Sequence, residues 1–100
     1  MQQQQPAYVA ALSKADPELS ERVANLREYV LTDGALPAKV KTLMTMLCDA
    51  ILAHPDGVRA ISNRARALGA TEQEIAETVQ VAFLMGGLPA LVTGCNAFQE

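Results

Sequence analysis

The side chains best suited to thiol or acid–base chemistry in this 100-residue chain are two cysteines, Cys48 and Cys95, and a single histidine, His54. The cysteines lack the close spacing of a metal-binding pair, and one histidine does not complete a conventional zinc site. We therefore expect neither a metal nor a cofactor. Cys48 stands in a mostly apolar stretch beside Asp49, whose negative charge would oppose a thiolate. We expect this cysteine to be buried and unreactive.

His54 directly precedes Pro55-Asp56-Gly57, a sequence that breaks one helix and begins another. At such a junction its imidazole is a candidate general base, with Asp49 or Asp56 as a carboxylate partner. A plainer alternative is that His54 bonds a carbonyl group or solvent at the helix end. Asp56 is expected to cap the following helix instead of acting in a site.

Three further residues are candidate ligand-binding groups, namely Arg59, Asp49 and Thr42. Arg59 follows His54 by little more than one helical turn, and its guanidinium could hold a carboxylate or another anion. The alternative for Arg59 is an ion pair with a glutamate of another helix or another subunit. The available glutamates are Glu72, Glu74 and Glu77. For Thr42 the alternative is a hydroxyl that bonds the backbone of its own helix.

The elements that carry these residues are expected to be helices. Half of the residues are apolar but only 4% are aromatic, a composition that fits closely packed helices better than a β-sandwich. Asp16-Pro17-Glu18 and the capping box Thr71-Glu72-Gln73-Glu74 mark helix starts, and Gly86-Gly87 interrupts the last apolar stretch. We predict one all-α domain of about six helices over residues 8–100, after a disordered lead-in over 1–7. The expected helices cover about 8–15, 17–32, 37–54, 57–68, 71–85 and 88–98.

The charge balance makes some partners unfavourable. The net charge is −3 and the pI is near 5.0, so the chain is a poor electrostatic match for nucleic acid. The first residues lack the basic and apolar regions of a secretory signal, and we therefore expect a cytoplasmic location.

Residues 81–92 form an uncharged, mostly apolar run. A membrane-spanning helix needs roughly 20 continuous apolar residues, and Gly86-Gly87-Leu88-Pro89 divides this run, so we expect no contact with a membrane. A helix that is apolar all round must be buried all round, which a chain of 100 residues can hardly provide alone. We therefore predict burial between subunits of a homo-oligomer.

Three segments of the chain stand out together, LPAKVK over 36–41, LGATEQEI over 68–75 and MGGLPALV over 85–92. In this order and at these separations they resemble the carboxymuconolactone decarboxylase family, which includes the alkylhydroperoxidase D-like proteins. The resemblance covers about two thirds of the chain. It implies a small all-helical subunit that assembles into homotrimers or homohexamers.

In the peroxidase branch of that family, a glutamate is followed twelve residues later by Cys-x-x-Cys-x-x-x-His, whose thiols react while the histidine and glutamate relay the proton. Placed on this sequence without gaps, the pattern falls on Thr42, His54, Gly57 and Ile61, so every reactive residue is replaced. Thiol peroxidase activity is therefore not expected. Decarboxylase-type or other family chemistry, on a small organic acid or a peroxide, would centre on His54. The alternative is a non-catalytic homo-oligomer that binds a small ligand or has a structural role.

Overall fold

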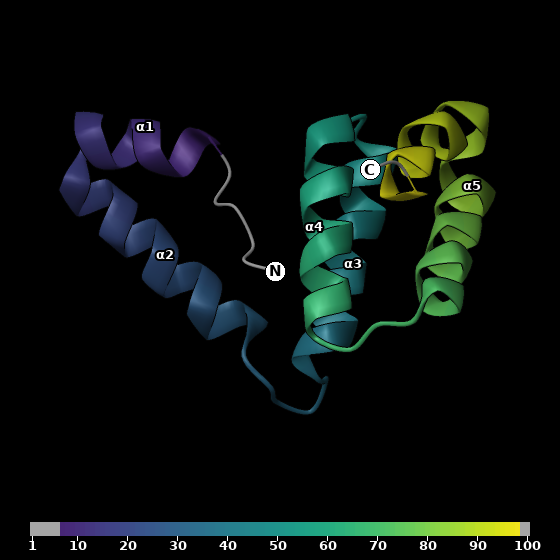
Figure 1. The fold of residues 1–100 in the computed structure, drawn as a ribbon, viewed down its shortest axis with the longest axis horizontal. Helices are drawn as coiled ribbons and strands as arrows, with labels where there is room; N and C mark the ends of the chain where they lie inside the picture. Colours follow the sequence, from purple (N-terminus) through teal and green to yellow (C-terminus); the bar gives the residue numbers. More distant parts are fainter. Residues whose placement is uncertain (1–6, 99–100) are drawn as a thin grey trace.

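Five α-helices and a short 3₁₀ helix make up residues 7–98, which are the residues described by the computed structural model (Figure 1). The elements are α1 (Ala7–Ala15), α2 (Pro17–Leu31), α3 (Ala38–Ile51), α4 (Pro55–Ala67), α5 (Glu72–Gly94) and η1 (Cys95–Phe98). Residues 7–98 contain no strand, which confirms the expected all-α class. Of the expected lead-in, residues 1–6 lie outside the described residues, and Ala7 already belongs to α1.

Local sequence signals place two helix starts where they were expected. The Asp16 side chain accepts a hydrogen bond from Leu19 N at 3.0 Å and caps α2. At the start of α5, Glu74 N donates to Thr71 Oγ1 at 3.0 Å and Thr71 N donates to Glu74 Oε1 at 2.8 Å. This reciprocal pair is the capping box that the sequence predicts.

The long helix α5 is bent sharply at Gly87, whose φ of 77° and ψ of −164° are not helical. A Cβ on Gly94 would lie 3.0 Å from Val79 Cγ1, whereas fifteen residues of straight helix would separate the two by roughly 22 Å. The two halves of α5 therefore fold back on each other, as the interruption at Gly86-Gly87 indicates. By length and composition alone, Glu72–Phe98 is apolar and long enough to cross a membrane. The reversal at Gly87 is not the straight helix that such a crossing needs.

The hydrophobic core lies between α3, α4, α5 and η1, which together are called the body below. Its side chains are mostly small, and this allows the helices to approach one another closely. The buried apolar residues are Met46, Ala50, Val58, Ala65, Ala70, Ile75, Val79, Ala82, Ala90 and Ala97.

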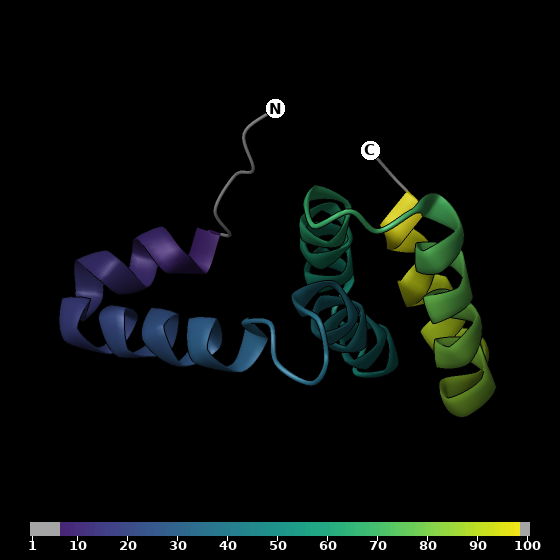
Figure 2. The same cartoon turned by 90° about the horizontal axis from the view of Figure 1, so that it is seen from below.

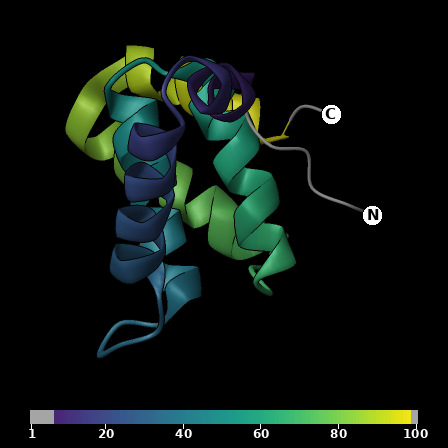
Figure 3. The ribbon, with the colours of Figure 1, turned by 90° about the vertical axis from the view of Figure 1, so that its left-hand side faces the viewer.

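The hairpin formed by α1 and α2 stands to one side of the body, joined to it through residues 32–37 (Figure 1, Figure 2 and Figure 3). Neither helix has a buried residue. The hairpin therefore takes no part in the hydrophobic core. It is held by contacts between α1 and α2 and by residues 32–37, which connect it to the body.

Candidate functional site

The chain passes from α3 to α4 through a tight helix cap. His54 N donates to Asp49 O at 2.8 Å and Ala53 N donates to Ala50 O at 3.4 Å, the two bonds of a Schellman motif. Ala53 takes the left-handed position of that motif with φ of 63°, where glycine is the usual residue. Because of this cap, α3 ends at Ile51, earlier than the expected end near His54, and His54 becomes the N-cap residue of α4.

This cap brings the His54 ring against a carboxylate. His54 Nδ1 lies 2.9 Å from Asp49 Oδ1, with 56% of the histidine side chain exposed and 25% of the aspartate side chain exposed. An ionised carboxylate can only accept hydrogen bonds, so the proton on this contact belongs to Nδ1, and Nε2 is left as the proton-accepting nitrogen of the neutral ring. Of the two aspartates that the sequence left open as partners, the structure places Asp49 on His54.

Asp56 has a different place from the one expected. The sequence predicts it as the cap of the helix, but Pro55 is the first helical residue, so the N-cap position falls on His54. Asp56 lies in the first turn, where its Oδ1 accepts from Arg59 Nη1 at 3.1 Å and its side chain is 97% exposed. The expectation that Asp56 caps α4 is wrong.

Gly57 gives the Asp49 carboxylate its position. A Cβ on Gly57 would lie 2.5 Å from Asp49 Oδ2 and 2.8 Å from Asp49 Cγ, so any larger residue would displace the carboxylate. The carboxylate thus packs on the first turn of α4, where the positive end of the helix dipole favours a negative charge. The sequence singles out Gly57 as a helix breaker, but nothing in it predicts this contact.

The other two candidate ligand-binding residues, Thr42 and Arg59, have contacts of their own. Thr42 is buried in α3 with 2% of its surface exposed, and its carbonyl oxygen accepts from Thr45 Oγ1 at 2.7 Å. Arg59 Nη2 donates to Asn96 Oδ1 at 2.9 Å, and Arg59 Nη1 donates to Asp56 Oδ1 at 3.1 Å. Arg59 joins the first turns of α4 to η1.

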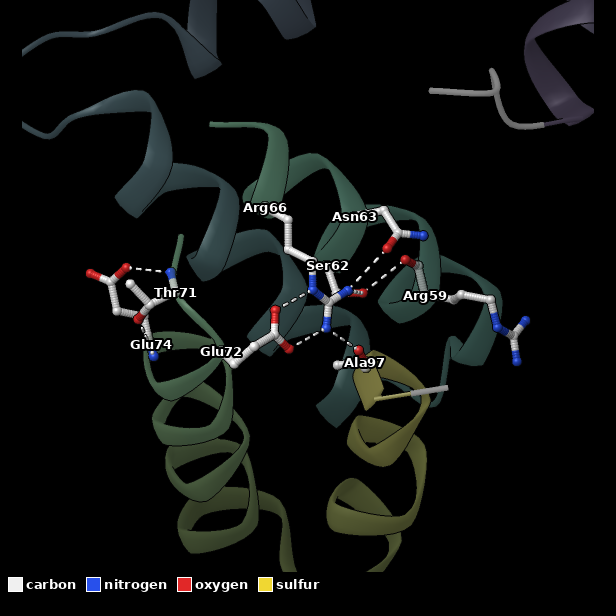
Figure 4. Close-up of polar contacts among 8 residues, drawn as sticks. All are labelled: Arg59, Ser62, Asn63, Arg66, Thr71, Glu72, Glu74 and Ala97. Atoms are coloured by element: carbon white, nitrogen blue, oxygen red, sulfur yellow. Dashed lines mark hydrogen bonds and ion pairs between the residues drawn. The ribbon is translucent and has the colours of Figure 1, made fainter. Parts of the chain in front are cut away.

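Another arginine of α4, Arg66, pairs with a glutamate, and its side chain links α4 to α5 and η1 (Figure 4). Its Nε and Nη2 bond both carboxylate oxygens of Glu72 at 2.7 and 2.9 Å, and Nη2 also donates to Ala97 O at 2.7 Å. The hydrogen bonds from the guanidinium lower the pKa of the Glu72 carboxyl and raise the pKa of Arg66. In the same view the Arg59 side chain points away from this cluster. Arg66 therefore fixes η1 and the start of α5 against α4 and takes no part in the His54 pair.

Comparison with known proteins places this geometry in a family. The model of the carboxymuconolactone decarboxylase family matches residues 17–100. The chain belongs to the carboxymuconolactone decarboxylase family.

Relatives of this family member share its sequence or its fold. It is 27% identical over 92 residues to the uncharacterized protein MJ1511 of Methanocaldococcus jannaschii, covering 92% of this chain and 86% of that protein. The crystal structure of apo-lpg0406, a carboxymuconolactone decarboxylase family protein from Legionella pneumophila, superposes with a TM-score of 0.85 at 32% identity, over 92% of this chain and 82% of the other. A putative carboxymuconolactone decarboxylase from Burkholderia xenovorans LB400 gives a TM-score of 0.84 at 26% identity, over 93% and 74%. These structures confirm the family fold expected from the three sequence segments.

Both cysteines of this family member are free thiols. Cys48 is exposed, so the expectation that it is buried is wrong. The reason is the side of α3 that faces the core, because Thr42, Met46 and Ala50 lie inward at four-residue spacing and Cys48 lies between the last two on the opposite side. Cys95 is half-buried at the start of η1, and the sequence contains no Cys-x-x-Cys pair.

Two of the hollows on the described surface of this carboxymuconolactone decarboxylase family member border on α3. One, of about 410 Å³, lies between α2, the 32–37 segment and Arg64 of α4. The other, of about 340 Å³, lies between α3 and α5, with Leu47 and Val81 in its walls. His54 and Asp49 line neither of them. With 56% of its side chain exposed, the His54 ring stands on an open surface of the single chain.

Proposed function

We propose that this carboxymuconolactone decarboxylase family member acts by general-base chemistry at His54, on a small organic acid, and without thiol redox chemistry. The observation that carries the proposal is the 2.9 Å contact between His54 Nδ1 and Asp49 Oδ1. A carboxylate that fixes one ring nitrogen of a histidine orients the other for proton transfer. The proposal that the chemistry involves no thiol redox step is supported by the lack of a Cys-x-x-Cys pair in the sequence.

The proposed step is the removal of a proton from a carbon next to a carbonyl group. Nε2 of neutral His54 takes the proton, the C–H electron pair remains on the substrate as an enolate, and the ring becomes a cation. Asp49 stabilises that cation through Nδ1–H, because a charge-assisted hydrogen bond is stronger than a neutral one. Arg59 lies on the same end of α4, little more than one turn beyond the His54 N-cap, and we propose that it binds the substrate carboxylate in exchange for its present partners, among them Asp56 and Asn96.

We propose further that the working form is a homo-oligomer, a homotrimer or a homohexamer. Several large apolar residues of α5 are more than half exposed, including Leu84 (77%), Met85 (73%) and Leu88 (64%). Apolar exposure on this scale is typical of an interface between chains. A neighbouring subunit over the α3–α4 junction would also turn the open surface at His54 into an enclosed site.

A second candidate function is a non-catalytic homo-oligomer that binds a small ligand or has a structural role. The observation that favours it is the position of His54 outside both hollows. In that case the Asp49–His54 pair serves only to hold the end of α3 against the start of α4.

Exchange of the substrate C–H proton for deuterium distinguishes the catalytic function from the non-catalytic one. Small carboxylic acids with a C–H group next to a carbonyl are incubated with the protein in deuterated water, and loss of the proton signal is followed by NMR. We expect exchange with the wild type, and a rate lower by roughly 10²- to 10⁴-fold for His54→Gln, since this is what a general base contributes. Asp49→Asn is expected to lower the rate by a smaller factor because the ring loses its orienting partner.

The matched control is Glu77→Gln, which removes a carboxylate of α5 that accepts from Gln73 Nε2, outside the α3–α4 junction. It leaves the Asp49–His54 contact and the Arg59 contacts in place, so the exchange rate should stay near that of the wild type. Equal rates for His54→Gln and the wild type would contradict the proposal. If no acid exchanges, pH-dependent binding of the same acids decides the second candidate, and identical binding curves for wild type and His54→Ala would exclude any ligand at His54.

A further inference from the structure

The hollow of about 410 Å³ between α2 and α4 has charged side chains of both signs in its walls. They are Arg27 and Glu28 of α2, Asp33 of the connection to α3, and Arg64 of α4. The volume lies within the range of about 300–1,000 Å³ that is typical of small-molecule sites. The hollow therefore combines the size of a ligand site with polar groups that could orient a ligand.

The two arginines of the hollow come from different helices and have no partner in the described chain. Within residues 7–98, no hydrogen bond or ion pair joins the guanidinium of Arg27 or of Arg64 to another residue. A guanidinium group presents its N–H donors as a fork that matches the two oxygens of a carboxylate. The other arginines of residues 7–98 are paired, Arg22 with Glu18, Arg59 with Asp56 and Arg66 with Glu72. The unpaired guanidinium groups thus lie together, in the walls of one hollow.

The acidic side chains of the same hollow would attract a cation. Glu28 has no hydrogen bond or ion pair with any other of residues 7–98. Asp33 Oδ1 accepts from Ala38 N at 2.6 Å, which caps α3. Two arginines and two acidic residues give the lining no net charge, so a simple anion and a simple cation are each repelled by half of it. A ligand that carries both charges matches such a lining better than either.

Contacts around the connection hold the walls of the hollow in place. Lys41 Nζ donates to Val30 O and to Thr32 O, both at 2.9 Å, and so binds the end of α2 to the first turns of α3. Within the connection, Gly34 N donates to Leu36 O at 3.0 Å. Figure 1 shows that α2 and α4 end on the same side of the molecule as this connection. A ligand therefore meets walls that are already formed, which lowers the entropy lost on binding.

We propose that this hollow binds a free α-amino acid, with its carboxylate between Arg27 and Arg64 and its ammonium group on Glu28. The carbon chain of the ligand lies against Leu31 and Ala38, the half-buried apolar residues of the lining. Both polar ends then make charge-assisted hydrogen bonds, which are stronger than neutral ones.

This site is separate from the general base proposed above, since neither His54 nor Asp49 lines the hollow. NMR titration of the whole chain tests it with three matched compounds. L-Valine carries both charges, isovalerate lacks the ammonium group, and isobutylamine lacks the carboxylate. We expect L-valine to shift the signals of Leu31 and Thr32 and to leave the His54 ring signals unchanged. Each analogue should bind roughly tenfold more weakly, because it loses one charged contact.

Two substitutions assign the two charges of the ligand to residues. Arg64→Gln should weaken the binding of L-valine and of isovalerate by roughly tenfold each, because both compounds carry the carboxylate. Glu28→Gln should weaken L-valine by a similar factor and should not weaken isovalerate, which has no ammonium group. Both side chains are exposed, so circular dichroism should show the helix content of the wild type.

The matched control is Arg22→Gln, which removes an arginine of α2 that lies outside the lining. It should leave the affinity for all three compounds unchanged. Isovalerate that binds as tightly as L-valine would overturn the proposal, because the hollow would then recognise an anion alone. Wild-type affinity in both Arg64→Gln and Arg27→Gln, or no shift with L-valine, would also overturn it. None of these results bears on the exchange test of His54.

Discussion

Gly57 and Asp49 are in contact so close that a Cβ on Gly57 would lie 2.5 Å from Asp49 Oδ2. The Asp49 carboxylate, which contacts the His54 ring, therefore keeps its position only because residue 57, in the first turn of α4, has no side chain. A residue that carries no chemistry of its own thus determines whether the Asp49–His54 pair can form.

Gly57→Ala tests this relationship. The added methyl group must push the Asp49 carboxylate away, and we expect a loss of roughly 1–3 kcal/mol in the free energy of unfolding, as for overpacked sites. The ¹⁵N spectrum of the His54 ring should also lose the preference for the Nδ1–H tautomer. The control is Gly34→Ala, where a Cβ would meet Lys41 Nζ at an ordinary 3.6 Å. Equal unfolding free energies for Gly57→Ala and the wild type would show that the carboxylate has room to move.

Ala53 and Gly69 occupy the same left-handed position in two helix caps, with φ of 63° and 97°. After α4, Ala70 N donates to Ala65 O and Gly69 N donates to Arg66 O, the same pair of bonds that His54 and Ala53 make after α3. A left-handed alanine costs about 1–2 kcal/mol. We therefore expect Ala53→Gly to raise the free energy of unfolding by about 1 kcal/mol, and Gly69→Ala to lower it by a similar amount.

Chemical denaturation of these two variants provides the measurement. A Cβ on Gly69 would have no neighbour within 4 Å, so the loss there would come from backbone conformation and not from a clash. If Ala53→Gly destabilises the protein, the left-handed alanine is not strained and the argument fails.

The free energy of unfolding at acidic pH should depend on Glu74. The backbone N–H of Thr71, and next the Lys39 ammonium at 3.0 Å, lower the pKa of this carboxyl below its ordinary value of 4.5. A group with a lowered folded-state pKa stabilises the protein above its unfolded pKa, and this contribution is lost as the pH falls from about 4.5 through the folded value. Glu74→Gln should therefore flatten the decline of stability below pH 4.5, measured by denaturation at a series of pH values.

The control for this prediction is Glu77→Gln, one turn further along α5. The Glu77 carboxylate accepts from the neutral Gln73 amide at 2.9 Å and not from an ammonium group. This variant should follow the wild-type curve, and an equally flat curve for both variants would show that the Thr71 and Lys39 contacts are not the cause.

Peroxide consumption should be the same in the wild type and in the double variant Cys48→Ser plus Cys95→Ser. The two thiols are free, they lie on α3 and η1, and they lack the one-turn spacing of a reactive and a resolving cysteine. The measurement is peroxide loss over time with a thiol reductant present. Turnover by the wild type that disappears in the double variant would contradict the proposal that this chain does no thiol redox chemistry.

Much of the fold follows from sequence because its signals act over a few residues. Asp16 caps α2, Thr71 and Glu74 form the capping box of α5, and Gly87 bends the chain, as expected from neighbours within one turn. Capping and turn preferences are properties of the local backbone, and no distant contact is needed to produce them.

The candidate site was harder to predict because it depends on which residues meet across helices. The sequence singled out His54 and left two aspartates as its partner, and a left-handed Ala53, which no composition rule favours, selects Asp49. The inward side of α3 decides that Thr42 is buried and Cys48 exposed, and that side is set by how α4 and α5 pack on it.

The sequence by itself thus determined the all-α class and most helix boundaries, and it singled out His54 as the candidate at which chemistry would centre. Only the tertiary structure decided the partner of that residue, the glutamate bound by Arg66 and the separation of the α1–α2 hairpin from the body. The physical reason is the separation in sequence over which each feature is determined. Helix caps are fixed by backbone hydrogen bonds within one turn, whereas side-chain pairs and the exposed faces of helices depend on how whole helices are placed against one another.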